Sequence, residues 1–168
     1  MLSLNGHPEV NTNLGRLNSL LSYYFLDGKN REVKLSRELQ AITDYLELEK
    51  LRYGDRINIS YSVKGDPGER KIAPLVLYPF IEHSIQHGCS LHYGVSWIKI
   101  QVGIHPQQLH FQVCNSKSGK EYDWQPGNNP GMVLNDPAKR LELLYEGRYL
   151  LNSGMKEDHY AVDLKIEI

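Results

Sequence analysis

The chain has 168 residues, with 19 lysines and arginines against 20 aspartates and glutamates, and a formal net charge of −1. This length allows one domain with a sizeable core and a short helical appendage, but hardly two full domains. The charges are balanced and no run of five like charges occurs, so nothing indicates binding to nucleic acid or to an acidic membrane surface.

The two cysteines, Cys89 and Cys114, are predicted to be free thiols in a reducing compartment, because a chain of this size does not need a disulfide framework. No apolar run approaches the roughly 18–20 residues that a membrane span requires. The N-terminus also lacks the basic-then-apolar pattern of a signal peptide. We therefore expect a soluble intracellular piece.

Two amphipathic helices are predicted in the first third of the chain. Apolar residues at positions 14, 17, 21 and 24 lie at helical spacing ahead of Gly28, and this stripe needs a partner from the rest of the chain or from another subunit. A second helix is predicted with Ser36 as its N-cap, and its apolar positions 39, 42, 46 and 51 recur to about residue 53.

The middle of the chain alternates between strand and helix patterns. Residues 57–63 have a period of two and end in a turn at 65–68, so they predict a half-buried strand. Pro74 introduces an apolar helix that should reach Gly88. Residues 98–102 and 109–113 alternate on either side of a turn at His105 and Pro106, which is typical of an antiparallel hairpin.

The last third begins with residues 116–135, which have no period and are rich in Gly, Pro and Asn, as in functional or mobile loops. Asp136 and Pro137 then fit the N-cap and first position of a helix that ends near Gly147. Tyr149 opens a further apolar stretch, and residues 162–168 form a last alternating strand. Hairpins combined with one-sided helices predict an α+β two-layer sandwich, in which helices cover one face of the sheet.

A histidine-rich stretch, PFIEHSIQHG, lies at residues 79–88. His83 and His87 are one helical turn apart and could bind a metal with His92, but the zinc-helix signature places its glutamate after the first histidine, and here Glu82 precedes it. The plainer interpretation is a set of polar residues at the negative end of a helix dipole. A catalytic triad is disfavoured because no nucleophile lies in a strand-to-helix elbow.

Longer motifs resemble the bacterial sensor histidine kinases of the LytS/YehU type. The chain reads LSRELQAITDYLELEKLRYGDR at 35–56, PLVLYPFIEHSIQHG at 74–88, WIKI at 97–100, LHFQVCNSK at 109–117 and KRLELLY at 139–145. In this order the motifs are specific to that family. The resemblance implies a GHKL-type ATP-binding domain at residues 35–168, with a mixed, mainly antiparallel sheet, and a remnant of the dimerisation and phosphoacceptor region at residues 1–34.

The resemblance also implies roles for residues of the 74–88 and 109–117 motifs. Glu82 matches the glutamate that polarises the attacking group in phosphoryl transfer, and Asn115 matches the residue that accepts a hydrogen bond from the adenine amino group. His83 stands where the family has its magnesium-binding asparagine, and an imidazole nitrogen is a poor substitute for an oxygen ligand. The remaining positions that match the nucleotide site of the family in these two motifs are Gln86 (in place of a lysine), His87, Gly88 and Lys117.

The lid motif of the family falls at residues 131–136, before the helix that contains Arg140. Gly131 and Leu134 match it, but Val133 replaces a glycine whose backbone amide would close on phosphate, and Asp136 replaces an asparagine. A β-branched residue resists positive φ, and a carboxylate repels phosphate. Gly131, Val133, Leu134 and Arg140 are therefore predicted nucleotide-binding positions, of which Val133 departs from the family motif.

Two functions follow from the resemblance. One is an ATP- and Mg²⁺-dependent catalytic domain that phosphorylates a histidine on a helix absent from this chain, because no PHFLFN-type string occurs in it. The other is a catalytically degraded pseudokinase that serves as a dimerising or relaying scaffold. In both, we expect a homodimer and a response regulator as partners, and a cytoplasmic domain of an inner-membrane protein that reaches the membrane only through absent N-terminal segments.

Overall fold

The computed structural model describes residues 8–88, 95–116 and 137–168. A five-stranded sheet forms its centre, in the order β2-β4-β5-β7-β6. These strands are β2 (Ile57–Lys64), β4 (Ser96–Ile104), β5 (Gln108–Ser116), β6 (Tyr149–Met155) and β7 (His159–Glu167). β2 and β4 are parallel, and the other neighbouring pairs are antiparallel. The predicted mixed, mainly antiparallel sheet is confirmed.

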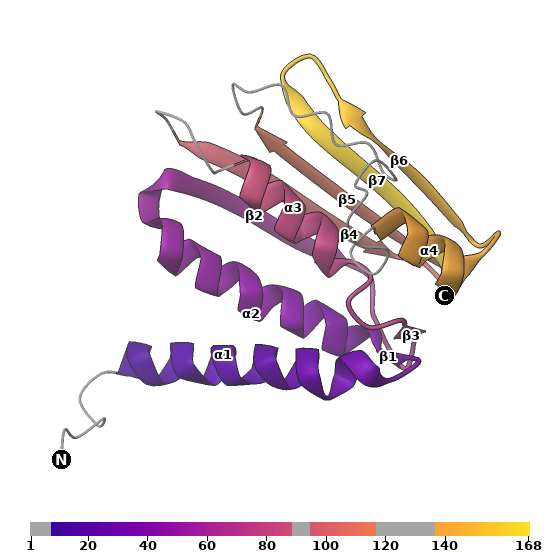
Figure 1. Cartoon of the computed structure of the whole chain (residues 1–168), viewed down its shortest axis with the longest axis horizontal. Coiled ribbons are helices and arrows are strands. Elements are labelled where there is room, and N and C mark those ends of the chain that lie inside the picture. The colour runs from indigo at the N-terminus through magenta and orange to yellow at the C-terminus, as the bar shows by residue number, and fades with distance from the viewer. Residues whose placement is uncertain (1–7, 89–94, 117–136) are drawn as a thin grey trace.

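Helices α2 (Leu35–Tyr53), α3 (Tyr78–Gly88) and α4 (Pro137–Tyr145) lie on one face of this sheet, and α1 (Pro8–Phe25) packs along the outer side of α2 (Figure 1). The opposite face carries no helix among the described residues. The predicted two-layer α+β sandwich, with its N-terminal helical extension, is therefore confirmed.

The core lies between the sheet and the helices, because alternate residues of each strand point toward them. On β5 these are Leu109, Phe111 and Val113, each 0% exposed. From the helix side, Phe80 and Ile81 of α3 meet them, and the rings of Phe80 and Phe111 are 6.3 Å apart between centroids. Burial of this kind contributes about 25 cal/mol per Å² of apolar surface, so α3 is held mainly by its sheet-facing side.

The apolar stripe on α1 packs on the rest of the described chain only at Tyr24, whose ring contacts Tyr78 of α3. Leu20 and Tyr23 are the buried residues of this helix, and they face α2. Leu14, Leu17 and Leu21 remain 52%, 43% and 44% exposed. The described chain therefore covers only the Tyr24 end of this stripe and leaves its three leucines exposed.

Two predicted helix starts were wrong. α2 begins at Leu35 and not after Ser36, because the extended residues of β1 (Val33–Lys34) pair with β3 (Lys71–Ile72) and the amide of Leu35 donates to the carbonyl of Arg70 at 2.8 Å. α3 begins at Tyr78, four residues after Pro74, because Leu75 has a φ of 58° and interrupts any helix there.

The remaining elements match the sequence closely. The hairpin of β4 and β5 turns where His105 donates its amide to the carbonyl of Gln108. Pro137 is the first residue of α4, and Gly147 follows that helix with a φ of 68°. Two single turns of 3-10 helix, η2 (Asp27–Lys29) and η3 (Gly54–Arg56), follow α1 and α2.

Cys114 is a free thiol, as predicted, whereas Cys89 and Asp136 lie outside the described residues. None of the described helices has the length and apolar character that a membrane span requires.

Candidate functional site

α3 carries most of the predicted site residues, and it presents them in different directions. Successive residues of an α-helix are about 100° apart around its axis. Ile81 and Ile85 face the sheet and are 0% and 1% exposed, whereas Glu82 and His83 are half-buried on its flanks. Glu82 therefore leaves the helix on the side of α2, and His83 leaves it on the side of β7.

His83 lies at the end of the sheet that also holds Asn115. Its ring is 6.2 Å from the ring of Tyr160 on β7, and Tyr160 is the cross-strand partner of Asn115 on β5. Burial raises the pKa of Tyr160 to about 12, partly offset by a hydrogen bond with Ser153. The structure thus brings two predicted residues, His83 and Asn115, to one place, and adds Tyr160, which the sequence reasoning missed.

Asn115 is a buried polar residue with an unfilled acceptor. It is 4% exposed, and its Nδ2 donates to the carbonyl of Ser116 at 3.0 Å. Its Oδ1 is fully buried and accepts no hydrogen bond from any described residue. A buried acceptor without a donor costs about 1–3 kcal/mol, so this orientation suits a ligand that brings a donor, such as the exocyclic amine of adenine.

Ser84 adds a second buried polar group to α3. This residue is 1% exposed, and its Oγ has no hydrogen-bond partner in the part of the chain that the structure describes. It follows His83 directly on α3. Nothing in the pattern of apolar residues could have singled it out, because a small residue is expected wherever a helix lies close to a sheet.

Glu82 lies on the other flank of α3, beside α2. Gln86, one turn later, donates its Nε2 to Oε1 of Glu82 at 3.2 Å. Burial raises the pKa of Glu82, and repulsion from the Glu49 carboxylate on α2 raises it further. A carboxylate with a raised pKa is a suitable general base near neutral pH, which is compatible with the role that the resemblance implied.

Tyrosines from three helices lie close enough to this carboxylate for its charge to raise their pKa values. Tyr78 of α3 contacts Tyr24 of α1 and Tyr45 of α2, at ring-centroid distances of 5.1 Å and 4.7 Å. Burial is the main cause that raises the pKa of Tyr78 to about 12, and the charge of Glu82 also raises it. A hydrogen bond with Tyr24 has the opposite effect. These hydroxyl groups stay protonated at physiological pH and keep α1, α2 and α3 in contact beside Glu82.

Arg140 forms a hydrogen bond within the fold. Its Nη2 donates to the carbonyl of Pro74 at 2.6 Å, and its Nε is buried without a hydrogen-bond partner among the described residues. The guanidinium thus holds the segment that leads into α3. Its predicted contact with nucleotide remains a prediction.

Several predicted positions lie outside the described residues, namely His92, Lys117, Gly131, Val133, Leu134 and Asp136. The backbones of His87 and Gly88 close α3, but the side chain of His87 is not described. Within residues 8–88, 95–116 and 137–168, no group of three or more His, Cys, Asp or Glu side chains could hold a metal ion. His83 is the described residue at the predicted magnesium position, and its ring lies beside an aromatic ring, which does not fit a hard cation that prefers oxygen ligands.

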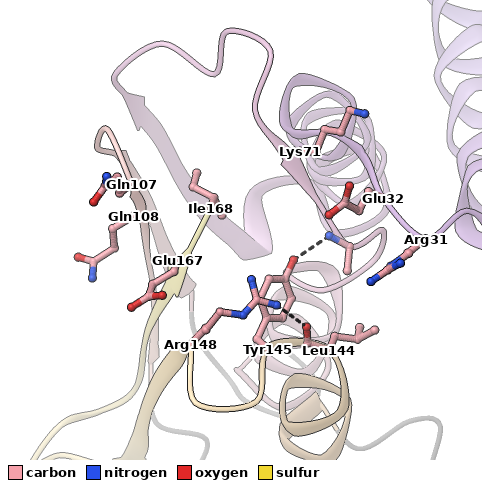
Figure 2. A pocket seen from close by; sticks show the side chains of 11 residues that line it. Arg31, Glu32, Lys71, Gln107, Gln108, Leu144, Tyr145, Arg148, Glu167 and Ile168 are labelled. Carbon is pink, nitrogen blue, oxygen red and sulfur yellow. Dashed lines mark hydrogen bonds between the residues drawn. The ribbon is translucent and has the colours of Figure 1, made fainter.

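A polar cavity of about 760 Å³ lies at the opposite end of β5 (Figure 2). Arg31, Lys71 and Arg148 line it together with two glutamates, Glu32 and Glu167. Gln108 at this cavity and Asn115 are seven residues apart on one strand, which places them roughly 23 Å apart. The cavity contains none of the predicted site residues.

The chain is similar in sequence to known histidine kinases. A family model described as histidine kinase matches residues 1–57. The sensor protein LytS of Staphylococcus epidermidis is 31% identical over 108 residues, and this alignment covers 62% of the present chain and 18% of LytS. The sensor histidine kinase BtsS of Escherichia coli K12 is 24% identical over 130 residues, covering 77% of the chain and 22% of BtsS. The chain is a relative of the LytS-type sensor histidine kinases.

The solved structures agree about the fold of this chain. The catalytic domain of histidine kinase ThkA superposes with a TM-score of 0.57 at 11% identity, covering 81% of the chain and 93% of that domain. The histidine kinase domain of a blue-light activated kinase from Erythrobacter litoralis gives the same TM-score at 13% identity, covering 93% of the chain and 73% of that structure. The sequence resemblance and the α+β fold of the GHKL type are therefore confirmed. The matched region spans only about a fifth of the length of LytS and BtsS.

Proposed function

We propose that this chain is the ATP-binding catalytic domain of a two-component sensor histidine kinase. The observation that carries the proposal is the Oδ1 atom of Asn115, which is buried at the end of β5 and accepts no hydrogen bond from any described residue. Adenine would supply the missing donor through its amino group. The relation to LytS and BtsS supports the same function.

In this function, Glu82 polarises the histidine that attacks the γ-phosphoryl group, and its raised pKa suits a base. Lys117, Gly131, Val133, Leu134 and Arg140 would border the nucleotide on the lid side, with Gln86, His87 and Gly88 at the end of α3. Phosphoryl transfer depends on position and charge, so the exact placement of α3 decides how well these groups act. ATP would supply the phosphoryl group.

The alternative is a pseudokinase that has lost magnesium-dependent transfer. What favours it is that His83, which by the resemblance stands in place of the magnesium-binding asparagine, has its ring 6.2 Å from the ring of Tyr160. An imidazole binds softer divalent ions better than Mg²⁺. A domain of this kind could bind adenine nucleotide through Asn115 and act only as a scaffold.

Calorimetric titration with ATP separates these functions. We expect micromolar binding to the wild-type chain, and we expect His83→Asn to make that binding more dependent on Mg²⁺. Binding that strengthens with Mn²⁺ but not with Mg²⁺ would favour the pseudokinase. An absence of binding at millimolar ATP, with or without either metal, would contradict both forms of the proposal.

We also propose that residues 1–34 belong to a dimerisation region and that residues 35–168 form the ATP-binding domain. The exposed stripe of Leu14, Leu17 and Leu21 on α1 repeats at spacings of four and three, which is typical of a helix that pairs with a second copy. A solved structure of ThkA is described as a complex with the response regulator TrrA, and a response regulator is the proposed partner here as well. The domain would then be the cytoplasmic part of a sensor that other segments anchor in the membrane.

The dimer can be tested by sedimentation. Leu17→Glu should shift the chain from dimer to monomer, because it places a charge in the apolar stripe. Asn18→Glu adds the same charge at an exposed position beside the stripe and should leave the dimer intact. Equal behaviour of the two variants would contradict a dimer through this face.

A further inference from the structure

The segment that leads into α3 cannot cap this helix by itself. Residues 74–77 read Pro-Leu-Val-Leu and contain none of the Ser, Thr, Asp or Asn side chains that usually accept hydrogen bonds at a helix N-terminus. The first amides of an α-helix have no partner within the helix and carry partial positive charge. A buried helix start therefore needs an acceptor from elsewhere in the fold.

Glu38 of α2 supplies that acceptor. Its side chain is 0% exposed. Its Oε1 accepts the amide of Leu77 at 3.0 Å, and its Oε2 accepts the amide of Leu75 at 2.8 Å. The backbone of Tyr78, the first residue of α3, also hydrogen-bonds to this carboxylate. One carboxylate thus bridges from α2 to the start of the helix that carries Glu82 and His83.

The same carboxylate is connected to α1. Tyr23, which is 1% exposed on α1, donates its hydroxyl group to Oε2 of Glu38. The amide of Leu75 also approaches the Tyr23 oxygen at 3.3 Å. Burial raises the pKa of Glu38, whereas the hydrogen bonds from Tyr23, Leu77 and Leu75 lower it. All of these neighbours are donors, so they match an ionised carboxylate, which accepts only.

The segment is bound on its other side by α4. Arg140 donates to the carbonyl of Pro74. The amide of Ala73 donates to the hydroxyl oxygen of Tyr145 at 2.8 Å, which is the dashed line at Tyr145 in Figure 2. Between these contacts, Leu75 holds a φ of 58°, which a β-carbon disfavours. A left-handed leucine persists only when its surroundings fix it, and here its amide is fixed by Glu38.

We propose that Glu38 is a positioning residue for the nucleotide site, because it caps α3 from α2 and, through Tyr23, ties the start of α3 to α1. The placement of Glu82 and His83 then depends on a group that does not itself touch the nucleotide. A shift of α1 would be transmitted to α3 through the Tyr23–Glu38 hydrogen bond. The consequence for ATP rests on the proposed function, but the cap itself does not.

The test uses the whole chain with Glu38→Gln, and with Asp44→Asn as its matched control. Asp44 is also a buried carboxylate on α2, 6% exposed, but its described hydrogen bond comes from Gln40 of the same helix. A glutamine keeps the shape of Glu38 and turns one acceptor into a donor that opposes an amide. Two readouts are needed, namely amide hydrogen exchange at Leu75, Leu77 and Tyr78, and ATP affinity by calorimetry, both under conditions where each variant is folded.

We expect exchange at these amides to be at least about tenfold faster in Glu38→Gln, since a hydrogen bond to a charged group is lost, and ATP binding to weaken by at least about fivefold. Asp44→Asn should change neither readout. Tyr23→Phe should leave the exchange of Leu77 within about twofold of wild type, because the carboxylate keeps its amide partners.

Equal exchange at these amides in Glu38→Gln and Asp44→Asn would overturn the proposal. Faster exchange with unchanged ATP affinity would also overturn it, because Glu38 would then be purely structural. If the wild-type chain binds no ATP, the proposed function fails, and the exchange readout alone still decides whether Glu38 caps α3. If Glu38→Gln does not fold, Glu38→Asp gives the same readouts, because its shorter side chain cannot reach both amides.

Discussion

Glu38 and Asn115 are both buried polar residues next to α3, and the fold treats them in opposite ways. Both oxygens of Glu38 accept hydrogen bonds, and the donors of its carboxylate are the amides of Leu75, Leu77 and Tyr78 and the hydroxyl group of Tyr23. The side-chain oxygen of Asn115 accepts none from the described residues. Glu38 is 0% exposed and lies next to the start of α3, whereas Asn115 is 4% exposed and lies at the end of β5.

The difference indicates which of the two serves the fold and which serves a ligand. A saturated buried carboxylate stabilises the conformation around it, and its removal leaves donors unpaired. An unsatisfied buried acceptor costs stability, and a ligand that brings a donor repays that cost. We therefore expect variants of Glu38 to act first on stability and variants of Asn115 to act first on binding.

The largest effect on stability is expected from Glu38→Ala. It leaves the amides of Leu75 and Leu77 and the hydroxyl group of Tyr23 without their acceptor, and the free energy of unfolding should fall by about 3–5 kcal/mol. Urea denaturation followed by circular dichroism measures this change. Asp44→Ala, in the same helix, should cost no more than about 1 kcal/mol. Similar losses in the two variants would contradict a special role for Glu38.

Asn115→Leu is expected to show the opposite behaviour. It replaces an unsatisfied amide with an apolar side chain of similar size, so the free energy of unfolding should stay within about 1 kcal/mol of wild type or increase. Thermal unfolding without nucleotide tests this expectation. A loss as large as that of Glu38→Ala would mean that Asn115 is satisfied within the protein and that its acceptor does not await a ligand.

Glu49 is intermediate between Glu38 and Asn115, so Glu49→Gln tests the comparison of these two residues further. Its Oε2 is buried and accepts no hydrogen bond from the described residues, although Nη1 of Arg52 is 3.5 Å away. Burial and then Glu49 raise the pKa of Glu82, so removing this charge should lower that pKa while leaving it above the usual value. A carboxyl NMR titration of Glu82 measures the midpoint. An unchanged midpoint would contradict the repulsion.

The raised pKa of Glu82 makes the free energy of unfolding depend on pH. A carboxyl group whose pKa is raised in the folded state favours folding at low pH, and this contribution is lost as pH rises toward the folded pKa. Glu49→Gln should therefore reduce the loss of stability over that pH range. If the chain is an active kinase, the rising limb of its pH–rate profile should move to lower pH in this variant.

The smallest effect is expected on the outer face of the sheet. Partial burial raises the pKa of Asp163, but hydrogen bonds from His110 and Gln112 bring it below its usual value. Its stabilising contribution is therefore present above the unfolded pKa and is lost as pH falls through the folded pKa. Asp163→Asn should lower stability by less than about 1 kcal/mol at pH 7, because the side chain is partly exposed.

Denaturation at pH 7 and at pH 3 measures the difference between wild type and Asp163→Asn. The difference should shrink at the lower pH, because pH 3 lies below the unfolded pKa of an aspartate, so the stabilising contribution of this carboxylate has begun to be lost. A difference that persists or grows at pH 3 would mean that Asp163 acts through packing. Asp163 would then not resemble Glu38, which stabilises the fold through the hydrogen bonds that its carboxylate accepts.

Much of the fold could be predicted from periodicity. The alternation at 98–102 and 109–113 predicted β4 and β5, because one face of each strand is buried. The start of α3 could not be predicted, because its cap comes from Glu38, 39 residues earlier in the chain than Leu77. Glu38 itself looks like an ordinary polar residue of an amphipathic helix. Only the tertiary structure reveals that it points into the core.

The candidate site was accessible to sequence reasoning only in part. The motifs singled out Glu82, His83 and Asn115, and the structure brings His83 and Asn115 to the same end of the sheet through Tyr160. Tyr160 was missed, because an aromatic residue in an alternating strand is usually a core residue. The position of Arg140 at Pro74 was missed as well, since a contact across 66 residues leaves no local pattern.

The most direct test of the account is an ATP titration of wild type and Asn115→Leu at equal fraction folded. We predict that the wild-type chain binds ATP, and that the leucine variant binds at least about tenfold more weakly while unfolding at the same or a higher temperature. Asn115→Asp, which keeps an acceptor, should retain binding. Equal affinity of wild type and Asn115→Leu would contradict the central claim that this buried oxygen receives the nucleotide.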